Sequence, residues 1–235
     1  MNRDSVSSLG GTFSILVGIS YVVVGVAFLL LPAAQQPGVE EFDDFITSYA
    51  ESPTVLNIEY WVFVISALLA LGVVPAIYKL VRSASEGWVR WASNLAYLGF
   101  AFTALGFLRL LALLPEEAAA YADGNAAMRL IIEGDNIHLP IDPNLWLQFG
   151  AVGIWVLVVS LAALRTEGMP KLWAYIGVVA AVAYWLVVAG NVLEIPILIT
   201  IAAGVGGIIL APIWYIWIGL RLRRPPVEPP PSVPG

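Results

Sequence analysis

The chain has 235 residues, of which 60% are hydrophobic and only 12% are charged, and this composition excludes an ordinary soluble protein. Its formal net charge of −6 comes without a basic patch, which excludes nucleic acid as a partner. The absence of cysteine and the single histidine exclude disulfides, cysteine-ligated metal centres and bis-histidine haem within one chain, so we expect no cofactor.

Six segments are long and apolar enough to cross a membrane as helices. A hydrocarbon core of about 30 Å requires roughly 20 apolar residues, and the backbone must satisfy its own hydrogen bonds there. The predicted spans are Thr12–Pro32, Ile58–Leu80, Val89–Leu114, Leu145–Leu164, Leu172–Leu193 and Ile197–Leu220. The predicted fold is therefore all-α, a six-helix bundle in the lipid bilayer that forms one domain over residues 1–224.

The first span is predicted to stay attached as an anchor. Its apolar run is long for a signal peptide, and Pro32 occupies the third position before the best cleavage point, where proline is unfavourable. Ser14, Gly18 and Gly25 are small, so we expect this helix to approach its neighbours closely.

The segment after the first span, "EEFDDFITSYA", has the spacing of a short amphipathic helix. Its apolar residues recur at helical intervals, at Phe42, Phe45, Ile46 and Tyr49. The polar face is acidic, so attraction to anionic headgroups does not explain the helix. We expect it to cover the outer mouth of the bundle.

The third span contains a charged residue, Arg109, within the run "GFLRLLALLP". If the span ends at Leu114, the Arg109 Cα lies on the order of 9 Å inside the hydrocarbon. A guanidinium group at that depth needs a partner or a route to water. Two interpretations stay open: the long side chain extends to the headgroups, or it takes part in a polar site.

Polar residues of two other spans are predicted at the depth of Arg109. One begins the second span, and two end the fifth span with an i, i+3 spacing that directs both to one face. We therefore predict an outward-facing polar pocket, a candidate ligand-binding site, that contains Arg109, Glu194, Glu59 and Asn191. The favoured interpretation of these residues is a structural ion pair, or an arginine that only reaches the headgroups, and ligand binding is the alternative.

The long segment between the third and fourth spans contains the single histidine, His138. It begins with "PEEAAAYA", whose acidic residues favour the start of a helix. His138 lies near Asp135 and Asp142 in the sequence and is a weak candidate for a metal ligand; a solvated loop histidine is the favoured interpretation. The motifs HExxH and GxSxG are absent, so we expect no enzyme activity.

The sixth span follows the fifth after a tight hairpin at Pro196. Its segment "IAAGVGGI" is interpreted as a surface for close helix packing, because no strand precedes it as in a phosphate loop. We expect Pro75 and Pro212 to kink the second and sixth spans. The tail, residues 225–235, is predicted to be a solvated polyproline segment, with a docking motif as the alternative.

The distribution of basic residues predicts the orientation. One side of the bundle carries Arg3, Lys79, Arg82, Arg90, Arg165, Lys171, Arg221, Arg223 and Arg224. The loops on the opposite side are acidic, with Arg129 as their one basic residue. The positive-inside rule therefore predicts a multi-pass protein of the plasma (inner) membrane with both termini cytoplasmic.

Three stretches resemble a known family: "GISYVVVGVAFLLLP", "GIWVLVVSLAALRTEGMPKLWAYIGVVAAVAY" and "PIWYIWIGLRLRR". They are similar to bacterial integral membrane proteins grouped as a domain of unknown function, DUF4386. The basic loop "EGMPK" before a helix that opens "LWAYIG" is the most telling feature. The resemblance implies a prokaryotic inner-membrane protein with six helices, and it implies no activity or catalytic residues.

Two functions are consistent with the sequence. The first is a non-enzymatic accessory or ligand-binding subunit, with a membrane-protein partner or as a homo-oligomer. The second is a small secondary transporter or channel that uses the buried Glu and Arg residues. The cytoplasmic halves of the spans offer few polar groups for a path, namely Asn94, Ser66, Ser160 and Tyr78. The sequence therefore favours the first function.

Overall fold

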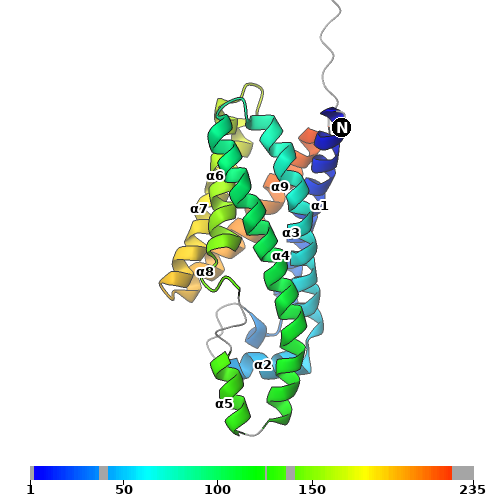
Figure 1. Cartoon of the computed structure of the whole chain (residues 1–235), viewed down its shortest axis with the longest axis vertical. Coiled ribbons are helices and arrows are strands. Elements are labelled where there is room, and N and C mark those ends of the chain that lie inside the picture. Colours follow the sequence, from blue (N-terminus) through cyan, green and yellow to red (C-terminus); the bar gives the residue numbers. More distant parts are fainter. Residues whose placement is uncertain (1–2, 37–41, 125, 136–140, 224–235) are drawn as a thin grey trace, which may run out of the picture.

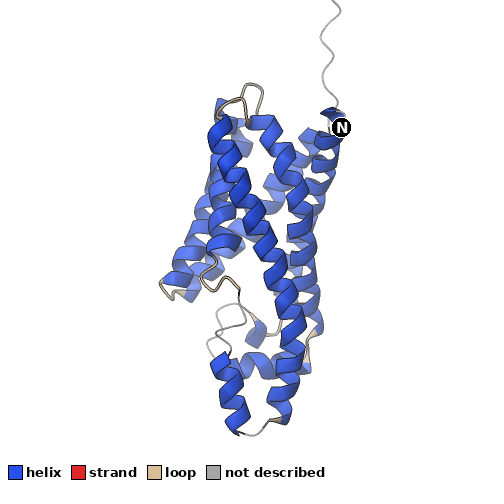
Figure 2. Ribbon diagram, viewed as in Figure 1, coloured by secondary structure: helices blue, strands red, loops and turns tan. Residues whose placement is uncertain are grey.

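The computed structural model describes residues 3–36, 42–124, 126–135 and 141–223. Within these ranges the regular elements are helices and no strand occurs (Figure 2). The same ranges contain six helical segments that are long and apolar enough to cross a membrane. The prediction of an all-α membrane bundle with six spans is confirmed.

The spans follow one another along the chain, and short helices lie between the first and second spans and between the third and fourth. The spanning helices are α1 (Arg3–Leu30), α3 (Thr54–Val81), α4 (Glu86–Asp123), η3 (Trp146–Ala151) continued by α6 (Val152–Arg165), α7 (Lys171–Val192), and α8 (Pro196–Ala203) continued by η4 (Gly204–Leu210) and α9 (Ala211–Leu222). The short helices are η1 (Ala33–Gln35), α2 (Phe42–Glu51) and α5 (Ala126–Asp135).

The helix α4 differs most from its prediction. It does not end near Leu114 but continues through Pro115 to Asp123. Pro115 removes one backbone hydrogen bond, and tertiary packing on both sides of it compensates. That packing forms a second small core outside the main bundle, which contains Leu31, Ile46, Tyr49, Leu56, Leu114, Ala118, Tyr121 and Ile132.

The predicted amphipathic helix after the first span is present as α2. Ile46 and Tyr49 are buried, as its helical spacing predicts. Gln35 of η1 holds α2 in place, because its Nε2 donates to the carbonyl oxygens of Ser48 and Ser52 at 2.9 and 3.1 Å. Figure 1 shows α2 lying across one end of the bundle, beside the extension of α4.

The small residues of α1 allow close packing, as predicted. The Ser14 hydroxyl donates to the Tyr215 carbonyl oxygen at 2.6 Å, which joins α1 to α9. A Cβ atom at Gly18 would lie 2.5 Å from Ile216, and one at Gly25 would lie 2.6 Å from Ile208. The backbones therefore approach to a distance that a larger residue would prevent.

A tryptophan-rich core fills one half of the bundle, between α6, α7 and α9. Trp155, Trp173, Trp214 and Tyr215 are at most 1% exposed. The rings of Trp173 and Trp214 stack with centroids 4.7 Å apart, and Trp155 meets Trp214 edge to face at 5.7 Å. This half of the bundle is therefore densely packed.

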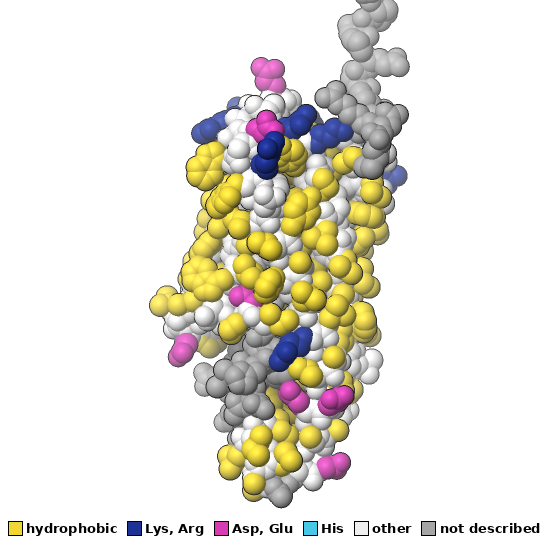
Figure 3. Space-filling model, in the orientation of Figure 1, with side chains coloured by type: hydrophobic (Ala, Val, Ile, Leu, Met, Phe, Trp, Pro, Cys, Tyr) yellow, Lys and Arg dark blue, Asp and Glu magenta, His cyan; other side chains and the backbone are white. Residues whose placement is uncertain are grey.

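The charged side chains divide the molecule into two ends. Lys and Arg side chains gather where α1 begins, an apolar surface covers the middle, and acidic side chains predominate toward α2 (Figure 3). We call the first the basic end; it carries Lys79, Arg82, Arg90, Arg165, Lys171, Arg221 and Arg223. The opposite end, which carries α2 and the end of α4, is the acidic end.

Candidate ligand-binding cavity

A cavity of about 560 Å³ lies between the helices, from the middle of the bundle to the acidic end. Its walls come from α1, α3, α4, η3, α7, α8 and η4, and Phe42 and Phe45 of α2 line it at the acidic end. Ligand-binding pockets in proteins typically measure about 300–1,000 Å³. The cavity therefore has room for one small organic molecule.

The oblique course of the sixth span creates this space. The helix α9 packs along α1, whereas α8 packs along α7, so the span crosses the bundle (Figure 1). As a result, α1 and α8 diverge toward the acidic end. Phe28 of α1 and Thr200 of α8 line the cavity from these two sides.

The glycine-rich segment of the sixth span has two roles rather than the single one expected. Gly206 is closely packed, because a Cβ there would lie 2.9 Å from the Ala183 Cβ. Gly204 and Gly207 line the cavity, and a Cβ at either position would have no neighbouring atom within 4 Å. These two glycines therefore leave space open instead of closing a helix contact.

An unusual helix start shapes the opposite wall. The Asp142 carboxylate accepts hydrogen bonds from the backbone N–H groups of residues 146–148, at 2.6 to 3.0 Å. Leu145 precedes them with a φ of 58°, a left-handed conformation that is unfavourable for leucine. The π-helical turn η3 then presents Gln148 and Phe149 to the cavity. Turns of this kind occur frequently at functional sites.

The cavity lining is predominantly apolar and aromatic. Its aromatic residues are Tyr21, Phe28, Phe42, Phe45, Tyr60, Phe63, Phe100, Phe107, Phe149 and Tyr184. Its uncharged polar residues are Gln35, Gln36, Ser66, Thr103, Gln148 and Thr200. Among the described residues that line it, Glu59 alone is charged.

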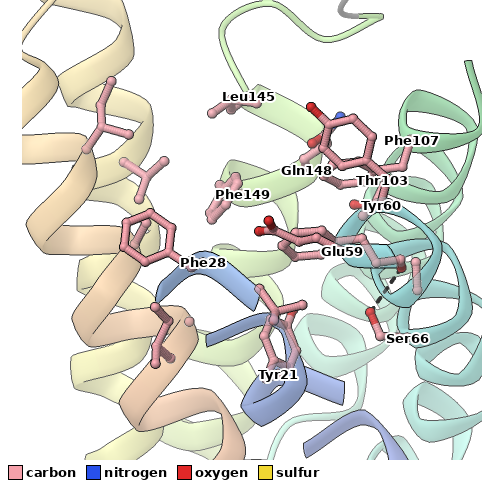
Figure 4. A pocket seen from close by; sticks show the side chains of 18 of the residues that line it. Tyr21, Phe28, Glu59, Tyr60, Ser66, Thr103, Phe107, Leu145, Gln148 and Phe149 are labelled. Carbon is pink, nitrogen blue, oxygen red and sulfur yellow. Dashed lines mark hydrogen bonds between the residues drawn. The ribbon is translucent and has the colours of Figure 1, made fainter. Parts of the chain in front are cut away.

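Glu59 points from α3 into the cavity, in the direction of Phe149 (Figure 4). It is 8% exposed, and its Oε2 atom has no hydrogen-bond partner in the described part of the chain. A buried carboxyl group without a partner is costly in an apolar environment. The Gln35 Oε1 atom also lines the cavity without a hydrogen-bond partner in the described ranges, so Glu59 supplies the charged group, and Gln35 a neutral acceptor, that a bound molecule can satisfy.

Aromatic contacts between α3 and α4 position this part of the wall. Phe107 stacks on Phe63 with centroids 4.5 Å apart, and its ring lies 5.2 Å from that of Tyr60. Tyr60 directly follows Glu59 in α3, so these contacts fix the helix where the carboxyl group emerges. Rings with buried faces next to a carboxyl group can also bind a cation.

Arg109 occupies a different face of α4 from the cavity. It is exposed and is not among the described residues that line the cavity. Phe107 faces α3, and a residue two positions later points roughly 200° away around the helix. Arg109 is also about 19 residues after Arg90, or roughly 28 Å along α4, which is close to one hydrocarbon thickness.

The other two predicted site residues lie at the end of α7. The Asn191 Nδ2 donates to the Pro143 carbonyl oxygen at 3.1 Å, which ties α7 to the segment before η3. Glu194 is exposed and has a φ of 55° where the chain leaves α7. The structure thus places Glu59 at the cavity, whereas the described lining does not include Arg109, Asn191 or Glu194.

Two sequence features lie outside the described residues. These are His138 and the predicted polyproline tail, residues 225–235. Within the described ranges, no group of three or more His, Asp or Glu side chains is arranged to hold a metal ion.

The aromatic lining and the role of η3 were not predicted from the sequence. Phe100 and Phe107 are seven residues apart, and Tyr60 and Phe63 are three apart, so each pair falls on one helix face. This spacing was the available signal. It is weak, because aromatic pairs at helical spacing also occur in ordinary helix contacts.

Comparison with known proteins identifies a family but no characterised relative. Neither a curated protein nor a solved structure matches the chain. Residues 16–221 match the family described as Domain of unknown function (DUF4386). This match covers all six spans in whole or in part, and the chain belongs to that family of unknown function.

Proposed function

We propose that this protein binds a small, largely apolar molecule in the cavity and is not an enzyme. The observation that carries the proposal is the cavity of about 560 Å³ with an unpartnered carboxyl group, that of Glu59, directed into it. Apolar walls with a few placed polar groups are typical of ligand sites. The protein would act as an accessory or ligand-binding subunit.

The tryptophan-rich core, which fills the half of the bundle nearer the basic end, supports ligand binding over transport. Trp155, Trp173 and Trp214 fill that half and are at most 1% exposed, so the cavity has a closed floor. Phe100 lines the cavity and packs edge to face on Trp155, with centroids 5.8 Å apart. A transporter would need this floor to open.

The charge distribution supports an outward-facing cavity. The basic end carries the Lys and Arg residues that the positive-inside rule assigns to the cytoplasm. In this orientation the protein lies in the plasma membrane with both termini cytoplasmic. The cavity then opens to the outer leaflet or the outer medium.

The proposal can be tested with a variant that fills the cavity. In Gly207→Leu the new side chain enters the open space, because nothing lies within 4 Å of a Cβ at this position. Gly87→Leu is the matched control: its Cβ position is also free, but Gly87 does not line the cavity. The purified proteins are reconstituted into phosphatidylcholine liposomes.

Binding is measured as energy transfer from tryptophan to the neutral probe diphenylhexatriene or to its trimethylammonium derivative. Transfer to probe dissolved in the surrounding lipid does not saturate as the probe concentration rises, so it is subtracted as the non-saturable component; protein-free liposomes supply the direct fluorescence of the probe. We expect a saturable signal from the wild type and from Gly87→Leu, and at least a tenfold weaker affinity in Gly207→Leu. Absence of saturable transfer with both probes, or equal affinity in all three proteins, would overturn the proposal.

A further inference from the structure

We infer that the cavity takes a lipophilic organic cation, with its positive charge next to the Glu59 carboxylate and its apolar part between α1 and η4. This inference rests on the proposed binding function and names the chemical class of the ligand. It follows from three features of the cavity: an uncompensated carboxyl group, aromatic rings around it, and open apolar space opposite it.

The first feature is the charge balance inside the cavity. Glu59 is the one acidic residue in the described lining, and the same lining contains no Lys, Arg or His. The Oε2 atom of Glu59 has no hydrogen-bond partner in the described ranges, and the side chain is 8% exposed. A bound cation would pair with this carboxylate, whereas an anion would be repelled by it at short range.

The second feature is the aromatic character of the surroundings. Tyr60, Phe63 and Phe107 form the adjoining wall. Phe149 lies opposite the carboxyl group (Figure 4). The faces of aromatic rings attract organic cations such as quaternary ammonium groups, and a nearby carboxylate adds to that attraction. A metal ion would find one carboxylate in the described lining, and no group of three or more His, Asp or Glu side chains is arranged to hold one within the described ranges.

The third feature is the space available to the rest of the ligand. Gly204 and Gly207 leave the wall opposite α3 open, and Val24 and Phe28 of α1 border the same space. These residues present apolar surface without charge. The cavity therefore combines one anionic point with an apolar compartment, which matches a molecule that has one positive group and an apolar body.

A matched pair of probes tests the charge requirement directly. Trimethylammonium-diphenylhexatriene carries a permanent positive charge, and diphenylhexatriene is the same fluorophore without it. Both are titrated into phosphatidylcholine liposomes that contain the wild type, Glu59→Gln or Glu51→Gln. The Glu51→Gln control removes the same charge from an exposed position in α2, outside the described lining.

We expect the wild type to bind the cationic probe at least tenfold more tightly than the neutral one. Glu59→Gln should lose this preference with little change in the affinity for diphenylhexatriene, since glutamine keeps the shape of the side chain. Glu51→Gln should keep the preference. Thermal unfolding of each variant verifies that Glu59→Gln is folded.

The outcomes separate this inference from the proposed function. Equal affinity of the wild type for both probes would overturn the cation inference and leave the cavity as a binding site for neutral molecules. A preference that survives in Glu59→Gln would overturn it as well, because the charge recognised would lie elsewhere. Absence of saturable binding of either probe would overturn both proposals.

Discussion

Gly177 is a residue at which the tryptophan-rich core depends on the absence of a side chain. A Cβ atom there would lie 2.0 Å from the Ser160 Oγ and 2.5 Å from the Trp214 Nε1. Real Cβ contacts essentially never fall below 3.0 Å, so α6, α7 and α9 could not keep their arrangement. One small residue thus permits three helices to meet.

We predict that Gly177→Ala destabilises the protein by about 1–3 kcal/mol, which is the usual effect of overpacking a core. Gly204→Ala is the control, because its Cβ would have open space around it, and alanine is a better helix former than glycine. Thermal unfolding in detergent should give a lower midpoint for Gly177→Ala than for Gly204→Ala. Equal midpoints would contradict the close helix contact.

Glu59 and Arg109, two of the three charged residues of the predicted pocket, illustrate what the sequence could indicate and what it could not. Both Glu59 and Arg109 stood out because charges within apolar spans are rare. The faces to which they point were not readable, because the residues three and four positions away from each of them, which share its helix face, are uncharged and non-polar. Glu59 turned out to face the cavity, and Arg109 to face away from it.

At the scale of elements, the length of α4 explains the position of Arg109. A 38-residue helix is roughly 57 Å long, so it extends well beyond a hydrocarbon core of about 30 Å. If the hydrocarbon begins near Arg90, it ends near Arg109. Leu114, Ala118 and Tyr121, which follow Arg109, are then buried in the small core that includes Ile46 and Tyr49 of α2 rather than by lipid.

If the hydrocarbon ends near Arg109, residues on one face of α4 should differ in their accessibility to water-soluble reagents on the two sides of this boundary. Leu105 and Arg109 are four residues apart and both exposed, so they share a face and differ by about 6 Å in depth. The chain has no cysteine, so single-cysteine variants can be made without removing any native thiol. A membrane-impermeant maleimide should label Arg109→Cys but not Leu105→Cys.

Glu116→Cys serves as the accessible reference for this experiment, since residue 116 is exposed in the extension of α4. The labelled fractions are compared in intact proteoliposomes and again after the protein is unfolded. Equal labelling at positions 105 and 109 would show that the hydrocarbon boundary lies elsewhere on α4.

At the scale of the whole molecule, six spans place the beginning of α1 and the end of α9 at the same end. A Cβ atom at Gly11 would lie 2.8 Å from the Arg223 side chain, which confirms that these ends are adjacent. The Lys and Arg residues at this end form the basis for the proposed cytoplasmic location. The cavity lies toward the opposite end, beneath α2.

The orientation predicts opposite labelling of the two ends in cells. A cysteine at Gly235 should react with an impermeant maleimide only after the membrane is permeabilised, whereas Glu116→Cys should react in intact cells. Labelling of the Gly235→Cys variant from outside intact cells would reverse the orientation. The cavity would then face the cytoplasm, and its ligands would come from the inner leaflet or the cytoplasm instead of the outer leaflet or the outer medium.

The number of spans and the two charged ends follow from local sequence. A segment of about 20 apolar residues must form a helix in lipid whatever its neighbours are, because no water is present to satisfy its backbone. The amphipathic spacing of α2 is equally local. These properties depend on a residue and its near neighbours in the chain, and the structure agrees with them.

The cavity, its single carboxyl group and the exclusion of Arg109 depend on how the helices cross. Positions that face lipid and positions that face another helix are both apolar, so a membrane span lacks the pattern that marks the buried face of a soluble helix. The divergence of α8 from α1 and the extension of α4 onto α2 arise from contacts between distant segments. Only the packing of those segments in three dimensions decides which side chains share one space.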